Sequence, residues 1–158
     1  MDDAADLRFG DDFDDAAMLL NTEVAIILQQ ITEQRRLEGL GHGEHIRHII
    51  EHASRFDLMK GDAARVSKVR ETSKTHEYDQ LHDYELVQMV NLGCGELDEA
   101  KTLIPSLRKK VEHGGADSLL DNKRLGSILD FIGQQRTLAE GTAGADADLG
   151  AAVGMDDE

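Results

Sequence analysis

The chain has 158 residues, a formal net charge of −15, one cysteine and one proline. This length fits one domain with appendages, and a lone cysteine excludes an internal disulfide and is typical of a reducing compartment. No apolar run approaches the roughly 20 residues that span a bilayer, so we expect no membrane association. Leucine, isoleucine, alanine, glutamate and glutamine dominate, which favours a helical fold.

The negative charge is concentrated at the two ends of the chain. Residues 1–15 carry seven acidic side chains and one basic one, and residues 140–158 carry six acidic side chains and no basic one. The segment between them is therefore nearly balanced. Because a net acidic chain repels the phosphate backbone, we expect any contact with RNA or DNA to be indirect, through a partner protein.

The N-terminal segment combines a short strand pattern with a first helix. Residues 6–9 alternate polar and apolar side chains, which predicts a strand with Leu7 and Phe9 on one face. No second strand is predicted, so this strand would pair with the sheet edge of another protein; a frayed acidic leader is the alternative. Asn21 is a suitable N-cap for the first helix. The apolar side chains of that helix repeat along one face: Val24, Ile27, Leu28 and Ile31.

Further helices follow in a regular succession. Gly93 is expected just past the end of one helix, and Pro105 stops the next. The final helix is expected from Asp117 or Asp121, with an apolar face that includes Leu125 and Ile128. The helices before it are predicted at 44–56, 63–73, 83–92 and 96–103.

These elements predict an all-α fold in three parts. Residues 1–43 form an acidic leader, strand and helix, residues 44–139 form a helical bundle, and residues 140–158 form a disordered acidic tail with almost no bulky apolar side chain. The first helix has no obvious local partner, so the front part is expected to dock on another chain. The alternative is that it packs on its own bundle as an ordinary core.

The sequence offers little support for an enzyme. His48 and His52 have a spacing that could share zinc, and His45 lies on the same face, but the segment is not HExxH and lacks nearby cysteine or aspartate ligands. No nucleophile motif, phosphate-binding loop or dinucleotide motif is present. We therefore predict no catalytic residue, no metal and no cofactor, and interpret the histidines as the exposed border of an apolar stripe.

Two basic clusters could touch phosphate. The first lies within residues 55–74 and the second at residues 108–110. Acidic side chains are interspersed in the first cluster, and neither cluster carries the interleaved aromatic side chains that stack on bases. A solvated helix face is the preferred interpretation of both.

Several collinear stretches within residues 7–138 form a distinctive set. The most specific stretch is LHDYELVQMVNLGCGELDEAKTLIPSL at 81–107, followed by LGSILDFIGQQRTL at 125–138. The others are LRFGDDFDDAAMLLNTEVAIIL at 7–28, IIEHASRF at 49–56 and ARVSKVR at 64–70. Together these stretches resemble the family of the fourth subunit of RNA polymerase II, the helical half of the polymerase stalk.

The resemblance implies a non-catalytic, nuclear subunit of DNA-directed RNA polymerase II. Its bundle would be similar to an HRDC domain, and its front part would pack on the seventh subunit, an OB-fold protein that faces emerging RNA. The pair would dock on the polymerase core near the clamp and support initiation and factor recruitment. The residues expected to bind the partner are Leu7 and Phe9, which would join its sheet, and Phe13, Leu19, Leu20, Val24, Ile27 and Leu28.

Two readings without a polymerase remain open from the residues alone. A free-standing nucleic-acid-binding helical domain would need a positive folded surface, which the acidic ends and near-neutral middle oppose. A general helical adaptor would share the composition but not the collinear motifs.

Overall fold

The computed structural model describes residues 3–11, 13, 16–41, 43–78, 80–113 and 120–149. Within these ranges the chain is helical and contains no strand, so the all-α prediction is confirmed. Two short 3-10 helices, η1 and η2, accompany seven α-helices. The elements are η1 (Asp3–Asp6), α1 (Asn21–Leu37), α2 (Glu44–Arg55), α3 (Ala63–Ser73), η2 (His76–Tyr78), α4 (Asp83–Leu92), α5 (Leu97–Leu103), α6 (Pro105–His113) and α7 (Asn122–Leu149).

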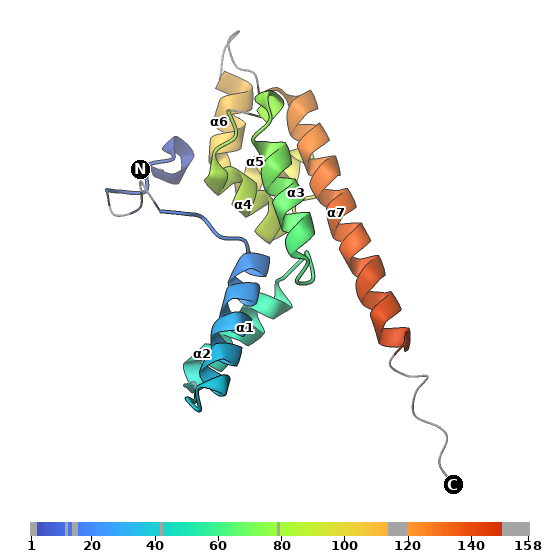
Figure 1. Ribbon diagram of the computed structural model, residues 1–158. Coiled ribbons are helices and arrows are strands. Elements are labelled where there is room, and N and C mark those ends of the chain that lie inside the picture. The colour runs from blue at the N-terminus through green and yellow to red at the C-terminus, as the bar shows by residue number, and fades with distance from the viewer. Residues whose placement is uncertain are drawn as a thin grey trace.

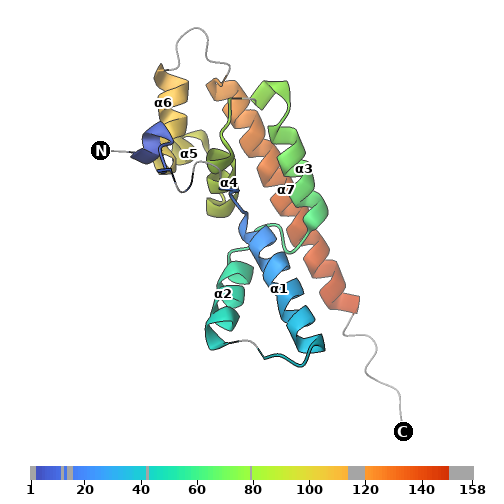
Figure 2. The same ribbon diagram turned by 60° about the vertical axis from the view of Figure 1, so that its left-hand side comes forward.

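The helices are arranged as a bundle with a projecting pair. α1 and α2 run antiparallel and extend away from the bundle of α3 to α7, as Figure 1 and the turned view in Figure 2 show. We call this pair the α1–α2 hairpin. α7 lies beside α3 and continues past its end. The described residues before Leu20, namely 3–11, 13 and 16–19, lie on the outside of the bundle; we call them the leader.

The core of the bundle lies where α3, α4, α6 and α7 meet. The apolar side chains of α4 and α7 that recur at helical spacing are buried, and for α7 this confirms the apolar face predicted from the sequence. The largest fully buried apolar side chains are Leu20, Met59, Leu86, Met89, Ile104, Leu107, Leu120, Leu125 and Ile128.

Helix boundaries follow from local chemistry. Asp62 caps α3 by accepting hydrogen bonds from the backbone amides of Ala64 and Arg65 at 3.0 and 3.1 Å. Pro105 is the first residue of α6, where its missing amide hydrogen is not needed. Gly93 ends α4 in the left-handed conformation, with φ of 68°, which confirms its predicted position.

Replacement of Gly93 by alanine is expected to destabilise the fold by about 1–2 kcal/mol, because a side chain disfavours the left-handed conformation. An added Cβ would also lie 2.9 Å from Cδ1 of Leu58 and 3.1 Å from a guanidinium nitrogen of Arg136. Gly95 is the matched control, since a Cβ there meets nothing within 4 Å. Urea unfolding of Gly93→Ala and Gly95→Ala measures the difference; equal free energies of unfolding would contradict this account.

Three features differ from the sequence-based predictions. Residues 6–9 form no strand: η1 ends at Asp6, and Leu7 has φ of 55°. The N-cap of α1 is Leu20 rather than Asn21. The reason is that the Glu23 carboxylate accepts a hydrogen bond from the Leu20 amide, and the Asn91 side-chain oxygen accepts one from the Asn21 amide. The third difference is at the other end of the chain.

Residues 140–149, expected to be disordered, continue α7 as helix. Alanine is the strongest helix former, and extension of an existing helix needs no new nucleus, which favours continuation through this alanine-containing segment. The remainder of the expected tail, residues 150–158, lies outside the described residues.

Candidate partner-binding surface

The base of α1 is joined to the bundle by a buried polar junction. The Asp57 carboxylate is 5% exposed and accepts hydrogen bonds from the Thr22 hydroxyl and from the amides of Met59 and Gly61, the latter two at 2.9 and 2.6 Å. Leu20, just before α1, is fully buried in the core. The hairpin is therefore fixed at its base, although most of its length lies outside the bundle.

A second tie joins α1 to α3. Arg70 donates hydrogen bonds from its guanidinium group to both carboxylate oxygens of Glu23, at 3.1 and 2.6 Å, and to the backbone oxygen of Met18 at 2.7 Å. Both charged side chains are about one-fifth exposed. Bidentate geometry of this kind fixes the orientation of the two helices as well as contributing energy.

Glu23→Gln is expected to destabilise the chain by about 1 kcal/mol at neutral pH. Burial raises the pKa of Glu23, but hydrogen bonds from Arg70 and from the Leu20 amide outweigh this effect, and the pKa lies below its ordinary value. The ion pair therefore stabilises the fold above the unfolded-state pKa, and this contribution is lost as the pH falls through the lower folded-state pKa.

Urea unfolding between pH 7 and pH 3 should thus show the difference between wild type and Glu23→Gln shrinking below about pH 4.5. Glu33→Gln removes a similar carboxylate from an exposed pair with Arg36 and is the control, with little expected change. A difference that stays constant with pH would contradict the assignment to Glu23.

Exposed apolar side chains gather on the hairpin and on the segment that leads into it. On α1, Ile27 is 41% and Ile31 47% exposed, and Leu19 just before the helix is 44% exposed. Apolar exposure of this density on one projecting element is typical of an interaction surface. The other large exposed apolar residues between positions 37 and 56 are Leu37, Leu40, Ile49 and Phe56.

A shallow groove runs between α1 and α3. Its volume is about 270 Å³, and it is mainly apolar with one charged side chain, that of Glu23. Leu19 and Ile27 form part of its rim. The groove is lined by Leu19, Glu23, Ile26, Ile27, Ala63, Val66 and Ser67. We define the hairpin surface as this groove together with the exposed side chains of α1.

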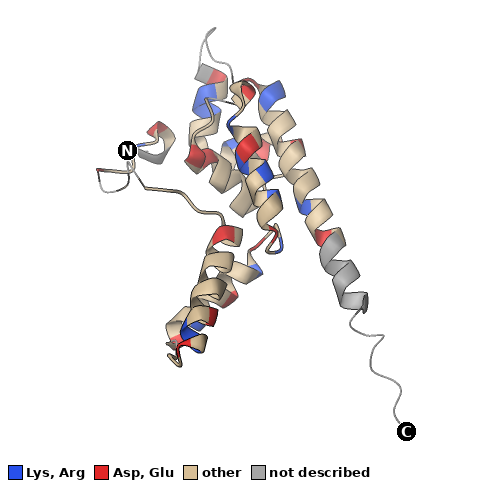
Figure 3. Ribbon diagram, viewed as in Figure 1, with Lys and Arg blue, Asp and Glu red and all other residues tan. Residues whose placement is uncertain are grey.

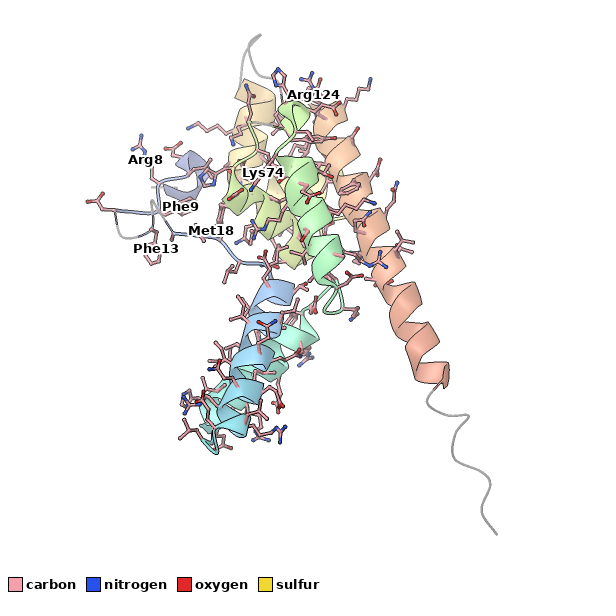
Figure 4. All side chains as sticks on the ribbon, in the orientation of Figure 1. Arg8, Phe9, Phe13, Met18, Lys74 and Arg124 are labelled. Carbon is pink, nitrogen blue, oxygen red and sulfur yellow. The ribbon has the colours of Figure 1, made fainter. Side chains whose placement is uncertain are left out.

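A larger cavity of about 560 Å³ lies between the leader and the bundle. Leu7, Phe9 and Phe13 line it from the leader side, and His82 and Lys110 line it from the bundle side. Figure 4 labels Phe9, Phe13 and Met18 along this stretch. The leader is therefore placed against the bundle, and does not extend freely into solvent.

The structure places the eight residues predicted to bind a partner in four different environments. Leu20 is fully buried in the core of this chain and exposes no surface to a partner in this structure. Leu28 lines a cavity between α1 and the start of α2. The half-buried Leu7, Phe9 and Val24 also contribute to the chain's own packing. The strongly exposed members of the set are Phe13, Leu19 and Ile27.

The absence of a local partner for α1, inferred from the sequence, is also corrected. α1 packs against α2 and α3. Sequence reasoning missed Asp57 and Thr22, which lie 35 positions apart and carry no motif. The front part thus packs on its own chain and still leaves an apolar surface exposed.

The three histidines of α2 lie on the surface. His45, His48 and His52 are all exposed, and the described residues contain no group of three potential ligands near enough to share an ion. Cys94 is buried, and this burial raises the pKa of its thiol. None of the described helices combines the length and apolar character needed to cross a membrane.

Basic and acidic residues are interspersed along α3, as Figure 3 shows. Arg70 is engaged by Glu23, Arg65 by Asp62, and Lys68 lies over the Phe131 ring at 5.9 Å. Arg65 and Arg70 are only 16% and 19% exposed in these pairs, so this part of residues 55–74 is not the solvated helix face that the sequence predicted.

The fold and its surfaces define an all-α protein with a projecting helical hairpin that carries several exposed large apolar side chains, a feature of subunits that assemble with other chains. A family model described as RNA polymerase Rpb4 matches residues 18–124. The chain belongs to this family.

Curated relatives agree with this assignment. DNA-directed RNA polymerase II subunit 4 of Arabidopsis thaliana is 33% identical over 113 residues, which cover 69% of this chain and 79% of that protein. Subunit rpb4 of Schizosaccharomyces pombe is 28% identical over 128 residues, covering 76% and 87%, respectively. Subunit rpb4 of Dictyostelium discoideum is 30% identical over 138 residues, covering 76% and 85%.

Proposed function

We propose that this chain is a non-catalytic subunit of nuclear RNA polymerase II that pairs with the seventh subunit to form the stalk. The observation that carries the proposal is the family match over residues 18–124, which includes α1 to α6 and the start of α7. The names of the relatives place those proteins in RNA polymerase II, and this chain is expected in the same complex.

The hairpin surface is the proposed contact with the seventh subunit. Leu19 and Ile27 expose apolar area beside an apolar groove, and burial of such area drives association. Leu7, Phe9 and Phe13 of the leader are proposed to join the contact, with Leu7 and Phe9 pairing with the partner's sheet edge once bound. Val24 and Leu28 support the hairpin from within.

The three-part division is proposed to carry three roles. Residues 1–43 bind the stalk partner, residues 44–139 form an HRDC-like bundle that supports docking near the clamp, and the acidic segment 140–158 lies beyond the bundle. RNA is expected to be met only through the partner, because both ends of the chain are acidic. In this role the pair supports initiation and factor recruitment.

Co-expression with the seventh subunit of the same organism tests the proposal. A stable 1:1 complex on size-exclusion chromatography, and recovery of RNA polymerase II subunits when the tagged chain is purified from nuclear extract, are the expected results. Recovery of the chain without polymerase subunits would favour a general helical adaptor. Salt-sensitive binding of the isolated chain to RNA would favour a free-standing nucleic-acid-binding domain.

A further inference from the structure

The leader contacts the bundle of its own chain at only a few side chains. η1 packs against α6, where the Lys109 ammonium forms an ion pair with Asp6. The Phe9 ring centre lies 4.8 Å from that of Tyr84 and 6.0 Å from that of His82. The hydrogen bond from Lys109 lowers the pKa of Asp6, so this pair is charged at neutral pH. We call the surface formed by these side chains of α4, α6 and His82 the α4–α6 face.

This position of the leader is only weakly held. The ion pair is exposed, and exposed pairs contribute little. The adjoining cavity leaves the apolar side chains of Leu7 and Phe9 only partly covered. Leu7 also adopts the left-handed conformation, which is unfavourable for a residue with a side chain. Met18 packs against the buried core, whereas the described residues before it do not belong to the core, so that earlier part of the leader can leave without opening the core.

The two proposed positions of the leader exclude each other. In the free chain Leu7 and Phe9 line a cavity against the bundle. In the proposed complex the same two side chains pack on the partner. One side chain cannot occupy both places, so binding of the partner must compete with the intramolecular contact.

We infer that the leader is an intramolecular occupant of the α4–α6 face and exchanges that face for the stalk partner when the complex forms. The inference rests on the proposed function, which supplies the competing site. Because the leader must first leave the bundle, its contact there lowers the apparent affinity for the partner. Departure of the leader uncovers Tyr84, His82 and Lys109, and makes this face available only in the assembled state.

Charge reversal across the Asp6–Lys109 pair tests the inference on the full chain. Chymotrypsin cleavage after Phe9, quantified by mass spectrometry, reports how often the leader leaves the bundle. Lys109→Glu and Asp6→Lys should each speed cleavage roughly two- to fivefold, the range expected for loss of an exposed pair, and the double reversal should restore the wild-type rate. Lys123→Glu on α7 is the matched control for net charge.

Affinity for the purified seventh subunit, measured by calorimetry, provides the second readout. Lys109→Glu, which leaves the leader unchanged, should tighten binding by a similar factor, and the double reversal should return it to the wild-type value. Two outcomes would overturn the proposed contact of the leader with the α4–α6 face. The first is a cleavage rate that rises as much in Lys123→Glu as in Lys109→Glu. The second is a cleavage rate that the double reversal does not return to the wild-type value. Faster cleavage with unchanged affinity overturns the competition alone. If the wild-type chain does not bind the seventh subunit, the proposed function and the exchange of the leader between bundle and partner are both overturned. The chymotrypsin experiment would still test whether the leader contacts the α4–α6 face.

Discussion

Leu19→Asp combined with Ile27→Asp is expected to weaken binding to the seventh subunit by on the order of 100-fold or more, because buried apolar anchors dominate interface energies. Both side chains are more than two-fifths exposed and line the groove between α1 and α3. Aspartate at these positions would place two charges in a contact that excludes water. Calorimetric titration of the partner into the variant measures the loss.

The same variant should keep its fold, since neither side chain belongs to the buried core. Far-ultraviolet circular dichroism should be unchanged. Leu92→Asp with Leu103→Asp is the matched control, because these leucines are 48% and 49% exposed on α4 and α5, away from the hairpin. Partner binding by Leu19→Asp/Ile27→Asp at the wild-type level would remove the hairpin surface from the proposed interface.

Asp57→Ala is expected to lower the free energy of unfolding by about 2–4 kcal/mol, since it leaves three donors without their buried acceptor. For a chain of this size the thermal midpoint should fall by roughly 5–15 °C. The loss should also weaken partner binding, because the base of the hairpin is no longer fixed. Thermal unfolding and titration of the partner measure the two effects.

Thr22→Val is the control for this junction. It removes only the hydroxyl donor and leaves the amides of Met59 and Gly61 bound to the carboxylate, so a loss of about 1 kcal/mol is expected. If Thr22→Val proved as harmful as Asp57→Ala, the two backbone hydrogen bonds would contribute nothing and the junction would reduce to a single side-chain pair.

Local signals in the sequence were sufficient to predict most helices. The apolar repeat of α7 and the stop at Gly93 act over one or two turns, so their effects are readable from neighbouring residues. α1 begins at Asn21, close to the predicted start, but its N-cap is Leu20, because the groups that satisfy the start of α1 come from Glu23 and from distant Asn91.

The arrangement of the front part could not be read from the sequence. An apolar stripe on α1 does not specify whether α2, the bundle or another protein covers it. The structure shows that Leu20 is core while Leu19, its neighbour, remains 44% exposed. That distinction depends on the direction in which α1 leaves the bundle, which is set by contacts such as Thr22 with Asp57 across 35 positions.

The projecting hairpin has a geometric consequence for assembly. α1 contains 17 residues, so at about 1.5 Å per residue its far end stands about 25 Å from its root. A protein bound to the α1–α2 hairpin would leave the opposite end of the bundle free for a third molecule. One small chain can therefore hold two larger proteins at a fixed separation. Their relative orientation would be set by the contacts at the base of α1.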